Sequence, residues 1–180
     1  HQELQRICTA NIKKDVGKCT YTHMLNSDGG IETDLTIVAI NENHFRIISS
    51  AATRERDKHH IKKHLNKDIE LKDVTDDYCV FGLFGPKSRN LLSPLCKDNF
   101  DNENFKFGTA KFISIEDIKI WTQRLSYVGE LGYELYVEAN DAKKIYELIL
   151  EKGKNFNLSN CGMHAMDIMR MESGFLHWGH

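Results

Sequence analysis

A phenol and two carboxylates lie around Gly129 and Gly132 in an otherwise apolar segment, a combination that core packing does not require. If the flanking segments are strands, these glycines let the chain reverse, because glycine reaches positive φ at little cost. We then expect Tyr127 and Glu134 to face each other across the turn. A carboxylate removed from water needs hydrogen-bond donors, so Glu134 is a candidate for binding a polar, N–H-rich heterocycle. The alternative is an ordinary hairpin in which Glu130 is solvated and a protein group satisfies Glu134.

A second acidic residue, Asp34, lies inside a predicted strand. The turn residues at 26–30 separate two apolar runs, which predicts a strand, a tight turn and a second strand. The neighbours of Asp34 are apolar on both sides of the strand, as in a strand that is covered on both faces. An aspartate there needs a chemical task or a partner. A backbone-capping or salt-bridged aspartate is the alternative.

Both segments, in this order and at this separation, resemble the folate-binding fold of the glycine-cleavage T-protein (aminomethyltransferase) family. The resemblance covers essentially the whole chain. The sequence departs from the family pattern at Met166, where the T-protein branch usually has arginine. A basic contact to folate is therefore either missing or supplied elsewhere. Further family motifs are 50–57, 81–89 and 165–174, while 104–108, 126–134 and His177-Trp-Gly-His180 look more like the folate domains of dimethylglycine and sarcosine dehydrogenases.

The resemblance implies roles for five residues. Asp34 falls on the acidic position held essential for one-carbon transfer. Thr36 and Ile48 fall on positions that line the folate site in the dehydrogenase branch. Tyr127 and Glu134 match the tyrosine and glutamate that contact the pterin. We therefore expect Asp34, Tyr127 and Glu134 to line one pterin-sized cleft.

For function, the resemblance implies a tetrahydrofolate-binding domain. It would accept a one-carbon unit from an N-methyl amino acid, of the dimethylglycine or sarcosine type, and give methylene-tetrahydrofolate. FAD would then belong to a flavin domain outside this sequence. One alternative is an aminomethyltransferase that takes its substrate from a lipoyl carrier protein. Another is a folate-binding or regulatory module without catalysis, which Met166 favours and Asp34 disfavours.

Charge and composition argue against other classes of partner. The chain has 24 Lys and Arg against 26 Asp and Glu, a net charge of −2, which gives no field for nucleic acid or an anionic membrane. No apolar run reaches the ~18 residues of a transmembrane helix. Five cysteines without Cys-x-x-Cys spacing favour reduced thiols in the cytoplasm, with the mitochondrial matrix as the alternative.

The histidines predict no metal site. His60 and His64 have a spacing that can bind zinc, but the two lysines between them repel a dication and no catalytic glutamate accompanies them. We expect a surface helix there instead.

The order of predicted elements indicates an α+β fold with mainly antiparallel sheets and flanking helices. We expect one partial T-protein-type domain over 1–180, with a subdomain seam near 66–77 and a C-terminal barrel outside this sequence. Arg170 and Glu172 are expected to form a structural ion pair. The predicted strands are 19–25, 31–40, 44–50, 78–84, 109–115, 118–125 and 133–137, and the predicted helices are 2–10, 53–65, 86–92, 142–150 and 163–173. We expect the apolar strand 78–84 to be buried.

Overall fold

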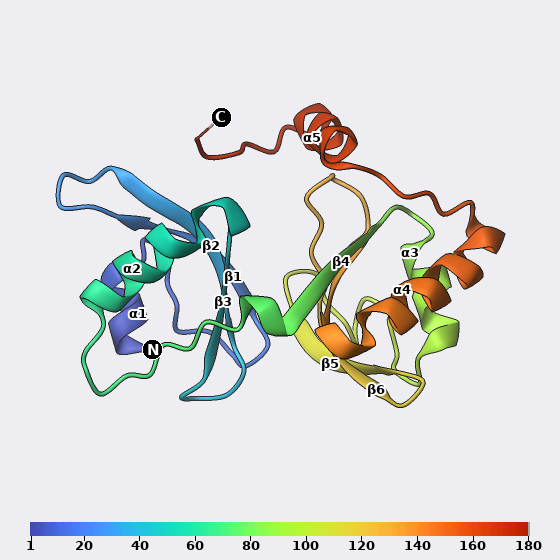
Figure 1. Cartoon of the computed structure of the whole chain (residues 1–180), viewed down its shortest axis with the longest axis horizontal. Helices are drawn as coiled ribbons and strands as arrows, with labels where there is room; N and C mark the ends of the chain where they lie inside the picture. Colours follow the sequence, from blue (N-terminus) through green and yellow to red (C-terminus); the bar gives the residue numbers. More distant parts are fainter. Residues whose placement is uncertain (180) are drawn as a thin grey trace. The chain divides into compact units, whose positions relative to one another are not determined.

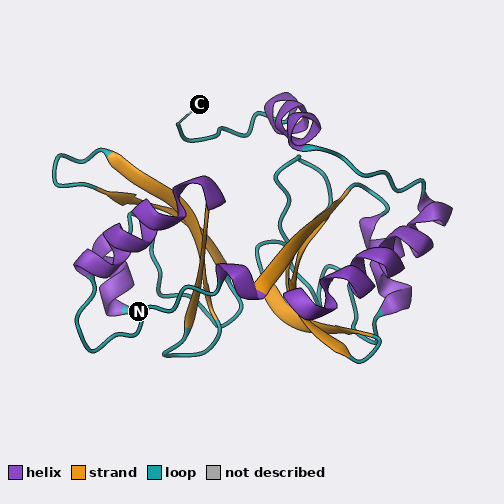
Figure 2. Ribbon diagram, in the orientation of Figure 1, coloured by secondary structure: helices purple, strands orange, loops and turns teal. Residues whose placement is uncertain are grey.

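The computed structural model describes residues 1–179, so His180 of the terminal motif lies outside the described residues. The chain forms two compact units, residues 1–73 and 74–180 (Figure 1). The boundary between Asp73 and Val74 falls within the polar stretch 66–77. Each unit is an antiparallel sheet with helices packed against one of its faces (Figure 2).

The first unit has a three-stranded sheet in the order β1-β2-β3, so neighbours in sequence are neighbours in space. Both sheet connections are short hairpins, which keep every pairing antiparallel. The elements of this unit are α1 (Gln2–Ile7), β1 (Cys19–Leu25), β2 (Ile31–Ala39), β3 (Phe45–Ser49), η1 (Ala51–Thr53) and α2 (Arg54–His64).

Alternation along β2 gives this sheet one apolar face and one polar face. Leu35 and Ile37 are buried against side chains of α1 and α2. Because successive side chains of a strand point to opposite faces, Asp34 and Thr36 lie on the face that these helices do not cover. The core cluster consists of Leu4, Cys8, Ile12, Met24, Leu35, Ile37 and Ile61.

The second unit has a four-stranded antiparallel sheet in the order β4-β7-β6-β5. The last strand in sequence, β7, is therefore central, and it pairs with β4 on one side and β6 on the other. The elements are η2 (Thr75–Asp77), β4 (Tyr78–Phe84), α3 (Ser88–Leu92), η3 (Ser93–Leu95), β5 (Ala110–Ile115), β6 (Ile118–Gln123), β7 (Gly132–Glu138), α4 (Ala139–Gly153), η4 (Lys154–Phe156) and α5 (Met163–Glu172).

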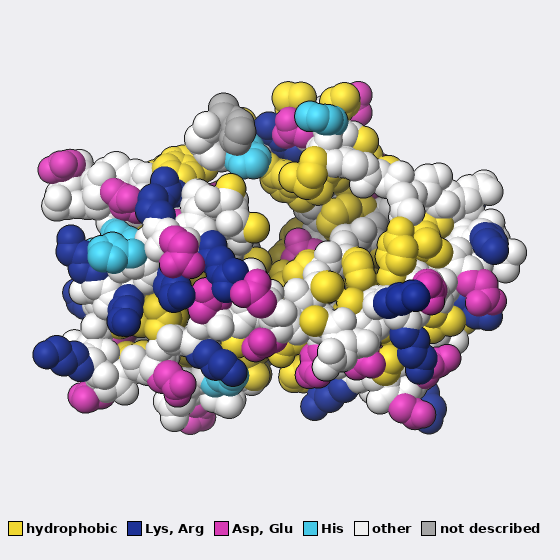
Figure 3. All heavy atoms as spheres, in the orientation of Figure 1, with side chains coloured by type: hydrophobic (Ala, Val, Ile, Leu, Met, Phe, Trp, Pro, Cys, Tyr) yellow, Lys and Arg dark blue, Asp and Glu magenta, His cyan; other side chains and the backbone are white. Residues whose placement is uncertain are grey.

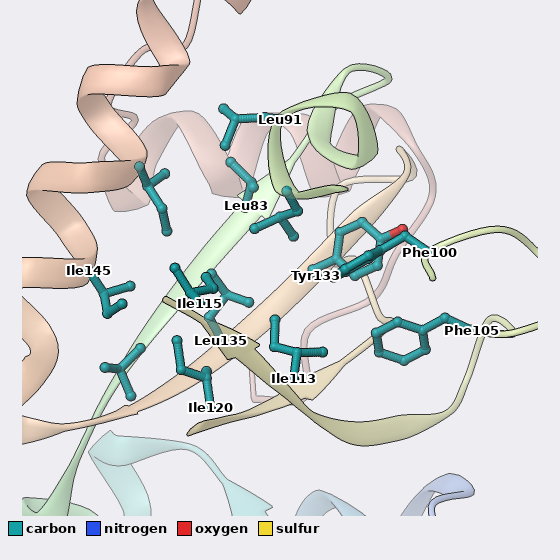
Figure 4. Packing of buried hydrophobic residues seen from close by; sticks show 13 residues of the cluster. Leu83, Leu91, Phe100, Phe105, Ile113, Ile115, Ile120, Tyr133, Leu135 and Ile145 are labelled. Atoms are coloured by element: carbon teal, nitrogen blue, oxygen red, sulfur yellow. The ribbon is translucent and has the colours of Figure 1, made fainter. Parts of the chain in front are cut away.

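One face of this sheet carries the larger core (Figure 4). Tyr133 and Leu135 of β7 are fully buried there, and Ile145 of α4 packs into the same cluster. The ring of Tyr133 contacts the rings of Phe100 and Phe105, which come from the connection between η3 and β5. By strand alternation, Glu134 of β7 points to the opposite face.

The predicted α+β class with antiparallel sheets and flanking helices is confirmed. Among residues 1–179, no helix combines the length and the apolar character that a membrane crossing needs.

The strand 78–84 was expected to be buried, but only Leu83 is buried in β4. Its apolar sequence is typical of a covered strand. The strand lies at the edge of the sheet, however, and has a pairing partner on one side only. An apolar run therefore does not distinguish a central strand from an edge strand.

The expected ion pair between Arg170 and Glu172 is wrong. Arg170 Nε lies 2.7 Å from Asp167 Oδ1, and the Arg170 side chain also donates to the Phe175 carbonyl. Residues two apart on a helix point in different directions, whereas residues three apart share a face. Arg170 thus links Asp167 within α5 to Phe175 in the chain that follows the helix.

Candidate functional site

The turn between β1 and β2 sets the register that positions Asp34. Asn26 Oδ1 accepts hydrogen bonds from the backbone N–H groups of Asp28 and Gly30, at 3.0 and 2.8 Å, and Gly29 has a φ of +81°. Such a side-chain-closed turn fixes which residues of a hairpin face each other. In the resulting register His23 lies directly opposite Asp34.

A phenol holds the carboxylate of Asp34. The Tyr21 hydroxyl donates to Asp34 Oδ2 at 2.9 Å, from the diagonal position on the neighbouring strand. The ring of Tyr21 also contacts that of His23 edge-on, with the ring centroids 5.3 Å apart. Asp34 is half-buried, while Tyr21 is 57% exposed. The group that orients Asp34 is therefore open to solvent.

Thr36 and Ile48 lie on the same face of the sheet as Asp34. Thr36 is two residues beyond Asp34 on β2, and it pairs directly with Ile48 of β3 and with Tyr21 of β1. Residues at such positions have neighbouring Cβ atoms. Three of the five predicted site residues thus form one patch on the first sheet.

In the second unit, a phenol holds the carboxylate of Glu134 as well. The Tyr136 hydroxyl donates to Glu134 Oε2 at 2.8 Å, from two residues further along the same face of β7. Burial raises the pKa of Glu134, and the hydrogen bond from Tyr136 opposes that shift. Tyr136 is only 6% exposed. This carboxylate therefore lies where water solvates it poorly, and each added N–H donor favours its charged form.

An aromatic ring lies over the glycines that neighbour Glu134 in the sheet. In register, Glu134 faces Gln123 of β6 on one side and Gly82 of β4 on the other. A Cβ atom built on Gly82 would lie 2.7 Å from the ring of Phe84, and one on Gly132 would lie 2.5 Å from it. A side chain at either position would therefore collide with the Phe84 ring where that ring now lies.

Tyr127 lies in the connection between β6 and β7. Its hydroxyl donates to the Leu176 carbonyl at 3.4 Å, and its ring packs near Phe175, with centroids 6.2 Å apart. Gly129 in the same connection has a φ of +74°, and a Cβ there would collide with Ser173. The glycine-rich connection thus packs against the chain that follows α5.

Gly129 and Gly132 were both expected to let the chain reverse through a positive φ. Only Gly129 has a positive φ. Gly132 is not among the residues with positive φ, and it already belongs to β7. A Cβ on Gly132 would lie 2.9 Å from the Leu125 carbonyl oxygen and close to Phe84. Its requirement for glycine is steric, not conformational.

Two tyrosines near the acids were missed from sequence, Tyr21 and Tyr136. We expected Tyr127 to be the phenol beside Glu134, but the phenol bonded to Glu134 is that of Tyr136. The signal for Tyr136 was its two-residue spacing from Glu134 on one strand. Tyr21 can be found only from the hairpin register, which places it diagonally across from Asp34 and which the sequence alone does not fix. Asp34 belongs to the first unit, and Tyr127 and Glu134 belong to the second.

Among residues 1–179, no group of three or more His, Cys, Asp and Glu side chains is arranged to hold a metal ion. His60 and His64 lie on α2 with ring centroids 4.5 Å apart.

The model of the GCVT N-terminal domain family matches residues 1–180. The chain belongs to the GCVT N-terminal domain family. It is 34% identical to 4-methylaminobutanoate oxidase (formaldehyde-forming) of Paenarthrobacter nicotinovorans, over 98% of this chain and 22% of that protein. It is 32% identical to mitochondrial dimethylglycine dehydrogenase of Homo sapiens, over 94% of this chain and 20% of that protein.

A third relative lies in the aminomethyltransferase branch. The chain is 30% identical to the aminomethyltransferase of Halothermothrix orenii, over 99% of this chain and 50% of that protein. The chain thus spans about a fifth of the oxidase and dehydrogenase relatives and half of the transferase. The expected resemblance to both branches is confirmed.

A solved structure shows the same fold. The glycine cleavage system aminomethyltransferase T of Bartonella henselae superposes with a TM-score of 0.81 at 20% identity, over 98% of this chain and 46% of that one. The expected T-protein fold is confirmed.

Proposed function

We propose that this chain is a tetrahydrofolate-binding domain that accepts a one-carbon unit from an N-methyl amino acid. Family membership supports the fold of such a domain, and two of the relatives act, by their names, on methylamino compounds. The oxidase relative is named for forming formaldehyde, the oxidation level of the unit proposed here.

Glu134 is the observation that carries the proposal. Its carboxylate is poorly solvated, it has the Tyr136 hydroxyl as one donor, and burial raises its pKa. A carboxylate has about four acceptor sites, so positions remain for the amino and ring N–H donors of a pterin. The aromatic ring of Phe84 lies over Gly82 and Gly132, and Gly82 is the partner of Glu134 in the sheet. Acceptor and aromatic surface together fit a flat, N–H-rich heterocycle.

We assign binding of the pterin to Glu134 and Tyr127. We assign contacts with folate on the first sheet to Thr36 and Ile48. Glu134 would accept the pterin N–H groups. Tyr127, whose ring packs near Phe175 in the chain after α5, would limit where the pterin lies. Thr36 and Ile48, paired in register, would offer a hydroxyl and an apolar contact.

Asp34 is assigned the chemical step. Tetrahydrofolate, when bound, supplies the nucleophilic ring nitrogen that takes up the carbon. The Tyr21 hydroxyl holds Asp34 Oδ2, which leaves Oδ1 to accept a proton from that nitrogen. The charge of the same carboxylate would stabilise a cationic iminium substrate. Closure of the methylene bridge to a second folate nitrogen would release the demethylated amine, which takes up one of the two N–H protons that tetrahydrofolate loses, and the other proton would pass to solvent. General-base help of this kind is typically worth ~10²–10⁴-fold in rate.

Under this proposal, FAD and the oxidation of the amine belong to a flavin domain fused to this one. The protein would work in the cytoplasm or, as its dehydrogenase relatives are named, in mitochondria. The relevant partners are the small-molecule amine and that flavin domain.

The second candidate is an aminomethyltransferase, favoured by the relative of that name at 30% identity. Its donor would be an aminomethyl group on a lipoyl carrier, and ammonia would be released. Ammonia released with an aminomethyl-lipoyl carrier as donor would favour this candidate over the first.

Calorimetric titration of the 180-residue chain with tetrahydrofolate tests the shared core of both candidates. We expect one site per chain, followed by accelerated formation of methylene-tetrahydrofolate from added formaldehyde. Binding without acceleration would show a non-catalytic folate module. Absence of binding by a folded chain would refute the proposal.

A further inference from the structure

A groove in the first unit lies between α2 and the turn that joins β1 to β2. It is formed by α2, by the turn between β1 and β2, and by Glu32 at the start of β2. The cavity measures about 290 Å³, and a second one of about 370 Å³ adjoins it toward α1. Both are lined by Asn26, Ser27, His60 and His64, so they form one continuous depression.

The wall supplied by α2 is a stripe of basic and imidazole side chains. Arg56, His59, His60 and Lys63 all line the groove, and their spacing of three and four residues puts them on one helical face. Figure 3 shows Lys, Arg and His side chains gathered over α2. Glu32 is the carboxylate among the residues lining the first cavity. The charges of the wall therefore favour an anion.

The imidazoles can donate to an anion in the groove once they carry a second proton. His64 Nδ1 donates to the His60 carbonyl oxygen at 2.8 Å, so Nε2 of the neutral ring is an acceptor and becomes a donor only on protonation. The rings of His60 and His64 are 4.5 Å apart. Burial, and then the neighbouring His64, lower the pKa of His60, so it takes up a proton only when an anion or a lower pH compensates. A bound anion would provide that compensation.

The turn adds a further donor. The carboxamide oxygen of Asn26 accepts two backbone hydrogen bonds within the turn, so its N–H₂ group is the end that can donate to a ligand. Ser27 lines both cavities and contributes a hydroxyl.

We propose that this groove binds a small oxyanion, a phosphate or a dicarboxylate, between Lys63, the imidazoles of α2 and the Asn26 turn. A transition metal fits less well. Arg56 and Lys63 would repel a dication, and among residues 1–179 no group of three or more His, Cys, Asp and Glu side chains is arranged to hold a metal ion. The site is independent of the proposed folate function and uses none of its residues.

The test is to titrate the 180-residue chain separately with inorganic phosphate, malonate and Zn²⁺. Binding is monitored through the NMR signals of the histidine imidazoles. We expect phosphate or malonate to shift the His60 and His64 signals with saturation, and the stronger of the two identifies the source of the oxyanion. Shifts by Zn²⁺ alone would overturn the proposal in favour of a metal site.

Two neighbouring lysines give a matched control. Lys63 lines the groove, whereas Lys62 is exposed on the same helix and does not line it. Lys63→Gln should weaken anion binding about fivefold, the order expected for one unit charge near the ligand, and Lys62→Gln less than about twofold. Equal effects of the two variants, with both folded by circular dichroism, would show only general attraction to a basic surface.

The pH dependence has a definite sign. With sulfate, whose charge is constant over the titration range of histidine, affinity should rise as the pH falls and His60 becomes protonated. The charged and titratable groups that face His60 are His64, His59, Lys63, Arg56 and Glu32 in the groove, Arg6 of α1 in the adjoining cavity, and Asp57 on α2. His60→Asn should flatten the profile. A profile unchanged by this substitution would contradict a role for His60.

Discussion

Each unit of the chain places a carboxylate on its sheet with a tyrosine hydroxyl bonded to it, yet the two pairs lie in different surroundings. Tyr21 holds Asp34 at 2.9 Å and is 57% exposed, while Tyr136 holds Glu134 at 2.8 Å and is 6% exposed. The pKa of Glu134 is raised by burial. The same pair of groups is thus used once near water and once away from it.

The difference suggests a division of work. A poorly solvated carboxylate gains most from new N–H donors, so Glu134 suits tight binding. A carboxylate oriented by an exposed phenol can exchange a proton with a reacting group and then with solvent, which suits Asp34 to the chemical step. Substitutions at the two sites should therefore affect different quantities.

The largest effect is expected from Asp34→Asn. Loss of the proton acceptor should slow formation of methylene-tetrahydrofolate from formaldehyde at least about a hundredfold. The dissociation constant for tetrahydrofolate should change less than about threefold. Rates from stopped-flow absorbance and affinities from calorimetry separate the two effects. An unchanged rate would remove Asp34 from the mechanism.

The next effect concerns affinity. Glu134→Ala should weaken tetrahydrofolate binding by about 10- to 100-fold, because charged hydrogen bonds of ~1.5–3 kcal/mol lose their acceptor. Glu138→Ala, at the exposed end of the same strand, is the matched control and should bind as the parent does. If both variants bind like the parent, the pterin is not held at Glu134.

Removing the phenols compares the two pairs directly. Tyr136→Phe should lower the free energy of unfolding by about 1–3 kcal/mol, because a poorly solvated carboxylate loses its donor. Tyr21→Phe should cost less than about 0.5 kcal/mol, since water replaces the exposed hydroxyl. Urea denaturation at neutral pH measures both. Equal losses would mean that the two carboxylates are solvated alike.

The smallest effect is a pH dependence. Because the pKa of folded Glu134 is above its unfolded value, the folded state binds this proton more tightly, and stability from this group falls as pH rises from the unfolded pKa through the folded one. Glu134→Gln removes the titration. The stability of this variant relative to the parent should therefore grow with pH across that window and then level off. A difference that is constant with pH would contradict the raised pKa.

The elements of the fold were largely predictable because their signals are local. The bounds of β1 and β4 agree with the predicted strands, since turn residues and alternating apolar residues mark them. Burial of β4 was not predictable, because it depends on the place of the strand in the sheet. The ion pair of Arg170 with Asp167, by contrast, was predictable from its three-residue spacing on a helix, which a search for family motifs ignores.

The candidate site was predictable in its acids and not in their partners. Asp34 and Glu134 stand out because carboxylates are rare in apolar strands. Tyr21 and Tyr136 become visible only once the hairpin register and the face of β7 are known. Whether Asp34, Tyr127 and Glu134 line one cleft stays a prediction.

The most direct test is to measure the pKa of Glu134 with and without tetrahydrofolate, by ¹³C NMR of labelled glutamate carboxyl groups. The account predicts that saturation with tetrahydrofolate shifts the Glu134 signal and lowers its pKa, because pterin N–H donors favour the charged carboxylate. A Glu134 signal and pKa that remain unchanged at saturation would contradict the account.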